Sequence, residues 1–511
     1  MKTITPISQS LFMAFLFVCL FSMNSFSQTD FKLSEYVNPD YQWHSLDLDF
    51  ALTGNNSFDK SVFLDEYNSE RTNNSFSGNL NTRYYSVKNS AYYQGSQTCF
   101  LNFSANGNGQ KDALRGSTPV YENKQKSNAQ NLLLGINSTN RFYNNRKRYF
   151  EANLLLSGSL NHSKSTIDYI SGLKPYPYVY ETQNNGNGLS VSIPLLVGTG
   201  RIEAVQDARL AVYIFDDLSK SGNLIKTPNN DEILAFSKYI TETKNQRFFD
   251  SRIRKIAEIT AIDSFLTVNG LKAKSDASYY TLLNDNWDNS NGPVRNAGHR
   301  FSIGLAPDLR TSFNEISNYH YDTINGSDEQ SFTNKDNTRL NSWGLDAVAG
   351  YVCEKPINLY WQRTTEISLN YSLFNSNSLA KSYADDILTD EQKVTTNQPN
   401  AGIVISQAYG YYPNSRTDIQ FGGSAGIDQY WGDSKRNDDP NIFSNQTIIN
   451  GRLFLGGHYY FSPQLRFTVY ISEQYHYSNQ TIKETTTDPE QNLKKNIFGS
   501  FINAGLTYSF F

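Results

Sequence analysis

The chain has 511 residues, of which 38% are hydrophobic, 18% are charged and 14% are aromatic, and its formal net charge is -4. This composition is too polar for a bundle of membrane helices, which needs several unbroken apolar runs of about 20 residues. The charged share lies below the roughly 25% of ordinary soluble proteins. The slightly acidic balance excludes nucleic acid as a partner, because such proteins carry a basic surface.

Residues 1–27 have the parts of a secretory signal peptide. Lys2 gives the positive start, Leu11 to Phe21 is an apolar run, and Ser25-Phe26-Ser27 is a small-x-small cleavage site. The run is too short for a membrane anchor, which needs about 20 residues. Cys19 lacks the small neighbours of a lipoprotein site. We therefore expect an exported protein whose residues 28–43 form a short periplasmic segment before the first strand.

After cleavage two cysteines remain, Cys99 and Cys353. They are not spaced as a zinc site is, so we predict no metal and no cofactor. A disulfide between them would require their two strands to be neighbours. Two thiols that are buried or face lipid are the favoured interpretation.

The main signal in the mature chain is the alternation of apolar and polar residues, which is typical of strands with two different faces. Ile367, Leu369, Tyr371 and Leu373, for example, alternate with polar side chains. Strands of soluble proteins have about 5 or 6 residues, whereas membrane-spanning strands need about 9 to 11. Length and alternation together predict an all-β transmembrane fold: a closed antiparallel up-and-down barrel, apolar outside and polar inside.

We predict about 14 strands, an even number as in single-chain bacterial barrels. Six precede a change of pattern and eight follow it, so barrel strands occupy 44–198 and 298–511. The predicted strands are 44–55, 74–89, 93–106, 127–142, 147–162, 188–198, 298–318, 337–353, 358–375, 397–411, 416–432, 445–461, 465–480 and 496–511.

Short and long connections alternate along these strands, as periplasmic turns and outer loops do. A soluble sandwich has no reason to keep that parity. The short turns are Lys88-Asn89-Ser90, Asn144-Asn145-Arg146, Glu354-Lys355-Pro356, Tyr412-Pro413-Asn414 and Ser462-Pro463-Gln464. The predicted long polar loops are 107–126, 319–336, 376–396, 433–444 and 481–495.

The carboxyl end resembles the β-signal of Gram-negative outer-membrane proteins, in which a polar residue, a glycine, an aromatic and a hydrophobic residue stand at fixed spacing. The matching residues are Asn503, Gly505, Tyr508 and Phe510, and a further Phe511 follows them, which departs from the usual ending by one residue. The resemblance implies an outer-membrane barrel that the barrel-assembly machinery inserts into lipid. It indicates no particular functional family.

Tryptophan and tyrosine near the predicted strand ends suit the aromatic girdles of such barrels. Trp43, Tyr351 and Trp361 lie near the predicted periplasmic ends, and Trp343 and Trp431 near the outer ends. Core packing in a soluble protein is the alternative, which their restriction to strand ends disfavours.

Between 199 and 297 the apolar period becomes helical. One helix is predicted from Ile202 to Leu218, ended by Ser221-Gly222, and a second from Asp231 to Thr243. A third stripe consists of Phe249, Ile253, Ile256, Ile259, Ile262 and Leu266, and a short helix covers 276–284. Counting strands back from a periplasmic carboxyl terminus places this insert in the periplasm. A connection of this length is a small domain rather than a turn.

Arg252, Arg254 and Lys255 form a basic cluster in the insert. Acidic residues balance this charge across the insert, so a solvated helix face is the simpler interpretation. The alternative is a docking surface for a periplasmic protein or peptidoglycan.

The sequence contains no recognised catalytic motif. Its six histidines are scattered, and only His320 and His476 lie where barrel enzymes carry theirs, so we predict no enzyme. Gly198-Thr199-Gly200-Arg201 lies between a strand and a helix as a phosphate loop does, but glycines that let the chain turn are the simpler reading.

Seven charged residues are predicted to line the lumen, where fixed charges would set solute preference. They are Asp308, Arg310, Asp346, Glu366, Asp418, Arg452 and Arg466. The alternative is that they pair across the lumen and only fill the barrel.

A passive channel or transporter for small solutes is the favoured function. A platform whose insert docks a periplasmic partner, and a transporter of hydrophobic ligands, remain open.

Overall fold

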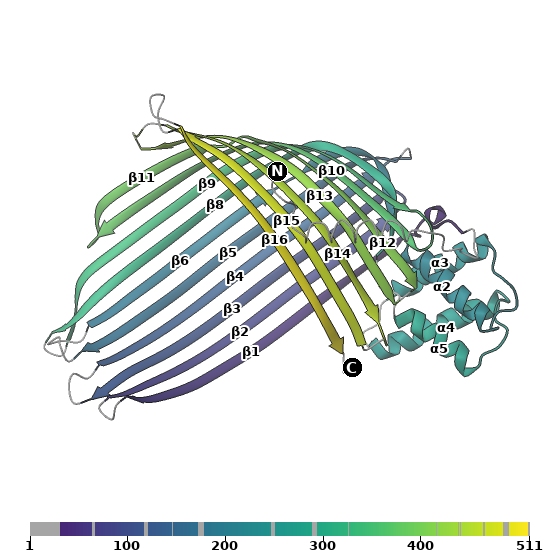
Figure 1. Cartoon of the computed structure of the whole chain (residues 1–511), viewed down its shortest axis with the longest axis horizontal. Helices are drawn as coiled ribbons and strands as arrows, with labels where there is room; N and C mark the ends of the chain where they lie inside the picture. Colours follow the sequence, from purple (N-terminus) through teal and green to yellow (C-terminus); the bar gives the residue numbers. More distant parts are fainter. Residues whose placement is uncertain are drawn as a thin grey trace, which may run out of the picture.

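A single antiparallel sheet contains all the described strands (Figure 1). The computed structural model describes residues 31–508 except 64–66, 117–120, 146, 172–177, 247–250, 289–293, 325–326, 415, 438, 440, 463–464 and 484–489. The predicted signal peptide and residues Phe510 and Phe511 therefore lie outside the described residues. The first half of the sheet consists of β1 (Tyr41–Phe63), β2 (Tyr67–Ser90), β3 (Tyr93–Gly116), β4 (Tyr121–Tyr143), β5 (Arg148–Ser171), β6 (Tyr178–Ser192) and β7 (Leu195–Ala204). The second half consists of β8 (Asn296–Ile324), β9 (Ser327–Pro356), β10 (Trp361–Ala384), β11 (Ile387–Asn397), β12 (Asn400–Asn414), β13 (Thr417–Arg436), β14 (Ile442–Tyr460), β15 (Leu465–Lys483) and β16 (Gln491–Tyr508).

These sixteen strands occupy fourteen positions in the sheet, the number predicted from the sequence. β6 and β7 both pair with β5 and β8, on either side of Pro194. β11 and β12 both pair with β10 and β13, on either side of Pro399. Proline has no N–H to donate to a ladder, so each of these prolines interrupts one continuous crossing of the sheet.

The predicted long loops are wrong. Most of their residues continue the strands, and β9, for example, is 30 residues long. Their Asn, Ser and charged residues suggested loops, but in the sheet opposite charges face each other across neighbouring strands. Such pairs join Lys60 to Glu70 (3.2 Å), Arg71 to Asp112 (2.7 Å), Lys164 to Glu181 (2.8 Å), Lys335 to Glu315 (2.7 Å) and Lys381 to Glu391 (3.2 Å).

The two faces of the sheet differ in chemistry, as the alternation predicted. One row of directly paired residues consists of Ile303, Ala349, Leu369, Ile403, Ile427 and Ile449. The neighbouring row, on the opposite face, consists of Ser302, Gly350, Ser368, Val404, Gly426 and Asn450. Ile303, Leu369 and Ile427 are 44–51% exposed. The sheet therefore presents an exposed apolar face, and the helical insert contacts the polar one.

The apolar band crosses the strands obliquely. The row that carries Phe50 in β1 and Leu80 in β2 runs through Phe103, Leu132, Leu160, Asn187 and Phe313 to Arg339 in β9. The row is therefore apolar at its β1 end and polar at its β9 end, while all its residues lie on the same face. Strands that are tilted against a level membrane produce such a drift, as in barrels.

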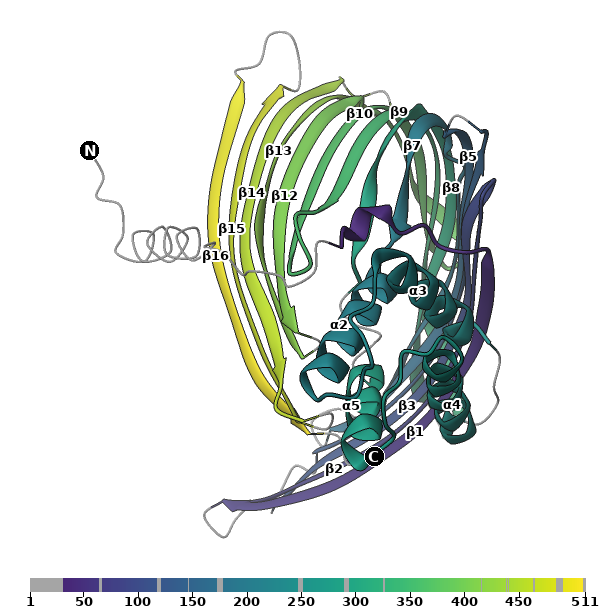
Figure 2. The ribbon, with the colours of Figure 1, turned by 90° about the vertical axis from the view of Figure 1, so that its right-hand side faces the viewer.

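The sheet curls round, but its two margins are not joined in this structure. Among the described residues β1 pairs only with β2, and β16 pairs only with β15. Figure 2 shows the two strands on opposite sides of the opening. The seam of the predicted closed barrel, by which we mean the contact between β1 and β16, is thus absent here. Because the antiparallel sheet has fourteen positions, an even number, its first and last strands run in opposite directions, which an antiparallel seam requires.

The insert folds into four helices near the predicted ones, α2 (Gln206–Lys220), α3 (Asn230–Lys244), α4 (Ser251–Val268) and α5 (Ala277–Asp288). The predicted start of the first helix at Ile202 is wrong, because β7 continues to Ala204. Asn229 and Glu232 form a capping box at the start of α3. Ile262 and Leu266 of the third predicted stripe are fully buried, but Ile253 and Ile256 are 55% and 63% exposed. That part of the prediction is wrong, because only the second half of α4 reaches the core of the insert. None of the described helices is long and apolar enough to cross a membrane.

Candidate functional site at the covered mouth of the sheet

The insert lies across the end of the sheet at which β1 begins and β14 ends (Figures 1 and 2). Its hydrophobic core includes Leu359 from the turn between β9 and β10, which is 4% exposed. The hydroxyl of Tyr213 in α2 donates to the carbonyl oxygen of Tyr412 in β12 (2.7 Å). Arg416, after β12, forms an ion pair with Asp285 in α5. The insert therefore packs against the turns at this end of the sheet, here called the mouth, and is not held only by its two chain connections.

A fully buried arginine, Arg295, holds the insert to the turn between β9 and β10. Its guanidinium donates to the carbonyl oxygens of Asn358 (2.9 Å), Trp361 (2.9 Å) and Leu359. It also donates to the side chain of Gln362 (3.3 Å). Burial and the nearby Arg209 lower the pKa of Arg295 to about 10. The side chain therefore stays charged at neutral pH, and its acceptors are neutral carbonyl groups.

Arg209 of α2 is 2% exposed and lies beside Arg295. The two guanidinium groups face the ring of Tyr412, at 5.7 Å and 5.3 Å from its centroid. Burial lowers the pKa of Arg209. An aromatic face attracts cations most strongly where water is excluded. Tyr412 thus links the wall of the sheet to two arginines of the insert.

The segment before β1, here called the strap (residues 31–40), crosses the same mouth. Phe31, Leu33 and Tyr36 are buried in the core of the insert. The hydroxyl groups of Tyr36 and Thr241 lie 2.7 Å apart. The Thr241 hydroxyl donates to Asp207 (2.6 Å), so the Tyr36 hydroxyl is the donor to Thr241. The strap includes the 3₁₀ turn η1 (Leu33–Glu35) and is an integral part of the insert.

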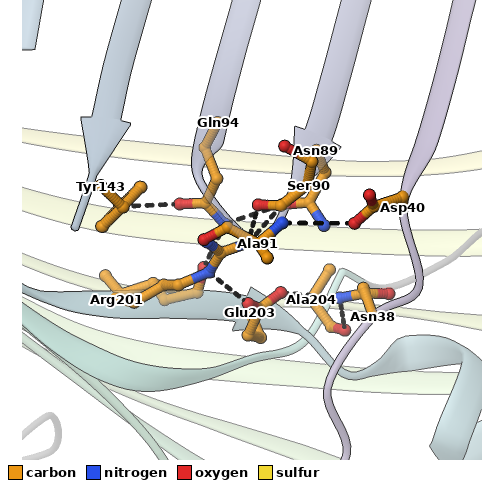
Figure 3. Close-up of polar contacts among 11 residues, drawn as sticks. Asn38, Asp40, Asn89, Ser90, Ala91, Gln94, Tyr143, Arg201, Glu203 and Ala204 are labelled. Atoms are coloured by element: carbon orange, nitrogen blue, oxygen red, sulfur yellow. Dashed lines mark hydrogen bonds and ion pairs between the residues drawn. The ribbon is translucent and has the colours of Figure 1, made fainter. Parts of the chain in front are cut away.

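A polar network ties the strap and β7 to the turn between β2 and β3 (Figure 3). Asn38 donates to the carboxylate of Glu203 (3.1 Å) and to the carbonyl oxygen of Ala204 (2.7 Å). Glu203 also accepts from Nε of Arg201 (2.5 Å). The other guanidinium nitrogens of Arg201 donate to the carbonyl oxygens of Ala91 (2.9 Å) and Ser90 (2.8 Å) and to Asn89 (3.1 Å). Arg201 and Glu203 are only 11% and 12% exposed.

We expect Arg201→Ala to loosen the strap. The change leaves Glu203 largely buried without its cation, which typically costs about 3 kcal/mol or more. The measurement is limited proteolysis of the folded protein, in which cleavage within residues 31–40 should become much faster. Arg148→Ala, at the exposed first residue of β5, is the matched control and should behave like the parent. Equal cleavage of both variants would show that Arg201 does not hold the strap.

The predicted turn at Gly198-Thr199-Gly200-Arg201 is wrong, because these residues lie inside β7, where the glycines allow close packing of the neighbouring strands. Gly200 has a φ of +95°, and a Cβ there would lie 2.2 Å from the carbonyl oxygen of His299. Gly198 has the ring of Tyr149 over it, 2.4 Å from where a Cβ would stand. Larger side chains would separate β7 from the strands beside it, and with them Arg201 from its partners.

All seven residues predicted to line the lumen lie on the polar face of the sheet, but not in one group. Asp308, Arg310 and Asp346 come together on β8 and β9, where Arg310 donates to Asp308 (3.1 Å). Gly344, opposite Asp308, leaves room for that carboxylate. Glu366 lies apart on β10, between Val352 and Ser406.

The other three lie on β13, β14 and β15. Asp418 is 5% exposed, accepts from Gln420 (3.1 Å) and lies 3.8 Å from His458. Arg452 donates to the hydroxyl of Tyr470, and Arg466 to that of Tyr460 (3.4 Å). Three of the seven thus contact another side chain of the same face, and Asp308 and Arg310 pair with each other. The structure therefore combines the two interpretations: the charges face the interior and several have partners there.

The predicted docking cluster is largely neutralised within the insert. Arg254 donates to Glu258 (2.7 Å) and to the carbonyl oxygen of Lys244 (3.1 Å). Lys255 forms an ion pair with Asp288 (2.7 Å). The side chain of Arg252 lies outside the described part. Two of the three charges thus have partners in the insert, as on a solvated helix face.

Other predicted features have simple surroundings. The ring of His320 stacks on Tyr178 (5.5 Å between centroids), and His476 is hydrogen-bonded to Asn450 (2.8 Å). Cys99 and Cys353 are not joined by a disulfide. Within the described ranges no three His, Cys, Asp or Glu side chains lie together as a metal site requires. Asn503, Gly505 and Tyr508 of the carboxyl-terminal signal lie in β16.

Sequence reasoning missed the arginines that hold the insert and the strap. Arg295 lies in a segment with no periodic pattern, and its partners are main-chain carbonyls, which leave no trace in sequence. Arg209 did carry a signal, because it occupies an apolar position of the helical stripe that begins at Ile202. A charged residue at such a position is a candidate for a buried contact.

No protein-family model and no curated protein matches the chain. The translocator domain of the autotransporter NalP from Neisseria meningitidis is similar to it in structure, with 9% identity, 89% of this chain and 96% of that chain covered, and a TM-score of 0.19. The toluene transporter TodX of Pseudomonas putida matches at 12% identity, 88% and 89% coverage and a TM-score of 0.19. A TodX deletion mutant, described as a monoaromatic hydrocarbon channel, matches at 9% identity, 89% and 92% coverage and a TM-score of 0.25.

These solved structures are outer-membrane β-barrels, the class that the carboxyl-terminal pattern implied. They indicate no functional family for this chain. Within the described residues the protein is a mostly-β chain: one antiparallel sheet of sixteen strands, with four helices inserted between β7 and β8.

Proposed function

We propose that the protein spans the bacterial outer membrane and acts as a passive channel for small polar solutes, with the insert as a stopper on the periplasmic side. One observation carries this proposal: the exposed face of the sheet has an apolar band with aromatic residues at both borders. Backbone can cross lipid only in helices or in sheets whose hydrogen bonds are all made.

The height of the band fits a membrane. On β13 the outward residues run from Trp431, which is 42% exposed, to Phe421. The ring centroid of Phe421 lies 6.3 Å from that of Trp361 and 5.6 Å from that of Tyr409. Ten residues at about 3.3 Å, on a strand tilted by about 40°, rise roughly 25 Å, the height of the apolar band of outer-membrane barrels. Trp43 does not belong to these borders: by alternation it shares the polar face, and it contacts Tyr85 (5.0 Å).

The inner face favours polar solutes over hydrophobic ligands. Toward the covered mouth it carries the buried pair of Arg141 and Glu151 (2.6 Å). Asp418 and His458 lie on the same face near the insert. A path lined by charges and amides offers a hydrophobic molecule no favourable surface, so the hydrophobic-ligand hypothesis is the weaker one.

Conductance across planar lipid bilayers tests the proposal. Purified full-length protein should insert and give discrete current steps, with long closed periods because the insert covers one mouth. Failure to insert would contradict the membrane assignment. Insertion without any current, even in variants that loosen the insert, would contradict the channel.

Asp285→Asn should raise the open probability. It removes the ion pair with Arg416, the contact between α5 and the turn after β12. Both side chains are partly exposed, so the loss is about 1 kcal/mol, or severalfold in the equilibrium. Asp288→Asn, which breaks an ion pair inside the insert, is the matched control and should leave the open probability unchanged. An equal open probability for both variants would show that docking of the insert does not control the opening of the channel.

The platform hypothesis is supported by a different observation, the exposed Ile253 and Ile256 at the start of α4. These positions lie one helical turn apart. Deletion of residues 203–290 distinguishes the roles. A stopper predicts larger conductance after deletion, whereas a platform predicts unchanged conductance and loss of a co-purifying periplasmic protein or peptidoglycan.

A further inference from the structure

The outer face of β8, β9 and β10 changes from apolar to basic along the strands, and each row can be read from the pairing. One row is Leu305, Ala347 and Tyr371, and two rows higher lie Leu309, Trp343 and Asn375. The next rows are Thr311, Asn341 and Asn377, then Phe313, Arg339 and Leu379, then Glu315, Asn337 and Lys381. An apolar surface is thus followed by aromatic, amide and finally charged side chains.

Two adjoining pockets lie along these rows of β8, β9 and β10, which are here called the column. The upper one, of about 430 Å³, is lined by Arg339, Lys381 and Asn337 together with Phe313 and Leu379. The lower one, of about 420 Å³, is lined mainly by Leu189, Val191, Leu309 and Trp343. Thr311 lines both. The surface therefore offers a basic pocket directly above an apolar slot.

The charge of the upper pocket is positive. Arg339 is exposed, and Lys393 follows in the same row, opposite Leu379. Glu315 is neutralised by Lys335 (2.7 Å). Lys381 pairs with Glu391 (3.2 Å), but with side chains 34% and 47% exposed this pair is weak and can be exchanged for another anion.

The pocket lies at headgroup height if the chain spans the membrane as proposed. Arg339 precedes Trp343 by four residues on β9. At about 3.3 Å per residue and a tilt near 40°, this places Arg339 roughly 10 Å beyond the tryptophan that borders the apolar band. The headgroup layer occupies this depth.

We infer that this column binds a phosphorylated lipid of the outer leaflet, with its phosphate at Arg339 and Lys381 and an acyl chain in the slot beside Leu309 and Trp343. Guanidinium and ammonium groups hold phosphate through charge-assisted hydrogen bonds. The amides of Asn341 and Asn377, between the two parts, face the sugar or ester groups of such a lipid. This inference rests on the proposed insertion into the outer membrane.

The test is native mass spectrometry of the full-length protein in neutral detergent, titrated with lipid A, a phosphorylated and acylated disaccharide. We expect the parent to retain one lipid A and Arg339→Gln/Lys381→Gln to bind it at least tenfold more weakly, as expected for the loss of two charge-assisted contacts. Lys111→Gln/Lys124→Gln removes two outward lysines that pair with Glu122, and should bind like the parent. Arg339→Lys should bind with intermediate affinity.

Each other result overturns the assignment. Equal retention by the double variant would exclude a role for these two cations. Equal retention of diacylglycerol, which has acyl chains but no phosphate, would indicate an apolar slot only, and displacement by millimolar inorganic phosphate would indicate a site for the free anion. Vesicle insertion is measured separately: protein that never enters vesicles contradicts the proposed function itself, whereas inserted protein without lipid preference contradicts this inference alone.

Discussion

Arg295→Ala is expected to free the insert from the mouth while the sheet stays folded. The variant leaves the carbonyl oxygens of Asn358 and Leu359 without the donor that satisfies them, whereas that of Trp361 keeps its bond from the Ile357 N–H (2.8 Å). Each buried unsatisfied group costs about 1–3 kcal/mol, so the docking contact should lose at least about 2 kcal/mol. That is a shift of roughly thirtyfold or more in the docking equilibrium.

The expected readout is a channel that stays open, measured as open probability in planar bilayers. Thermal unfolding of the sheet, followed by circular dichroism, should change little, because no strand loses a partner. Arg295→Lys keeps the charge but cannot reach four acceptors at once, and should give partial closure. Lys226→Ala, which removes an exposed pair with Glu232, is the control. Closure of the Arg295→Ala channel as in the parent would show that the buried arginine is structural only.

The strands of the sheet could be predicted because each of them alternates apolar and polar residues. Alternation reports which residues share the apolar face, and it holds from Leu46 in β1 to Leu506 in β16. Turns such as Asn144-Asn145 follow from residues that tolerate tight backbone conformations. Fourteen crossings were therefore countable, although Pro194 and Pro399 divide two of them.

The outer strand extensions could not be predicted in this way. Beyond the apolar band both faces of a strand are polar, so alternation disappears and only cross-strand pairs such as Arg71 with Asp112 remain. Such pairs depend on the register between strands, and the partners of this one are 41 residues apart in the sequence. Composition rich in Asn and Ser then resembles a loop.

The helices of the insert were predictable and its docking was not. Helical period locates α2 and α3, because each buries one face against its neighbours. The contacts that place the insert at the mouth involve Arg295, Tyr412 and Arg201, each reaching a main-chain carbonyl or a residue more than sixty positions away. No local pattern encodes such distances. The strap was expected only as a periplasmic segment, and its burial depends on the same tertiary contacts.

The two free margins lead to the second large prediction, that β1 and β16 join when the protein enters a membrane. In lipid an unpaired edge exposes about half of the backbone N–H and C=O groups of each strand, and each costs several kcal/mol. Over the 9 to 11 membrane residues of two strands the total far exceeds the 5–15 kcal/mol by which native proteins are stable. An open sheet therefore cannot persist there.

The apolar band fixes the approximate register of this seam. Leu48 lies in the outward apolar run of β1, 67% exposed, and Ile502 lies in that of β16, 71% exposed. Facing residues of an antiparallel pair are 4.5–5.5 Å apart at their Cα atoms, within the range that a disulfide bridges. We expect Leu48→Cys to crosslink with a cysteine at one of three outward positions, Ser500, Ile502 or Ala504, in a Cys99→Ser/Cys353→Ser background.

The crosslink is read as altered mobility of the monomer on non-reducing gels after oxidation in vesicles. Leu48→Cys with Phe501→Cys is the control and should not react, because Phe501 points to the other face of β16. A covalent dimer instead of a crosslinked monomer would mean that the margins of two copies pair, so that one larger barrel contains two chains. That outcome would satisfy the backbone equally well, but it would double the lumen and leave two inserts at its mouth, so a single copy could no longer be the conducting unit.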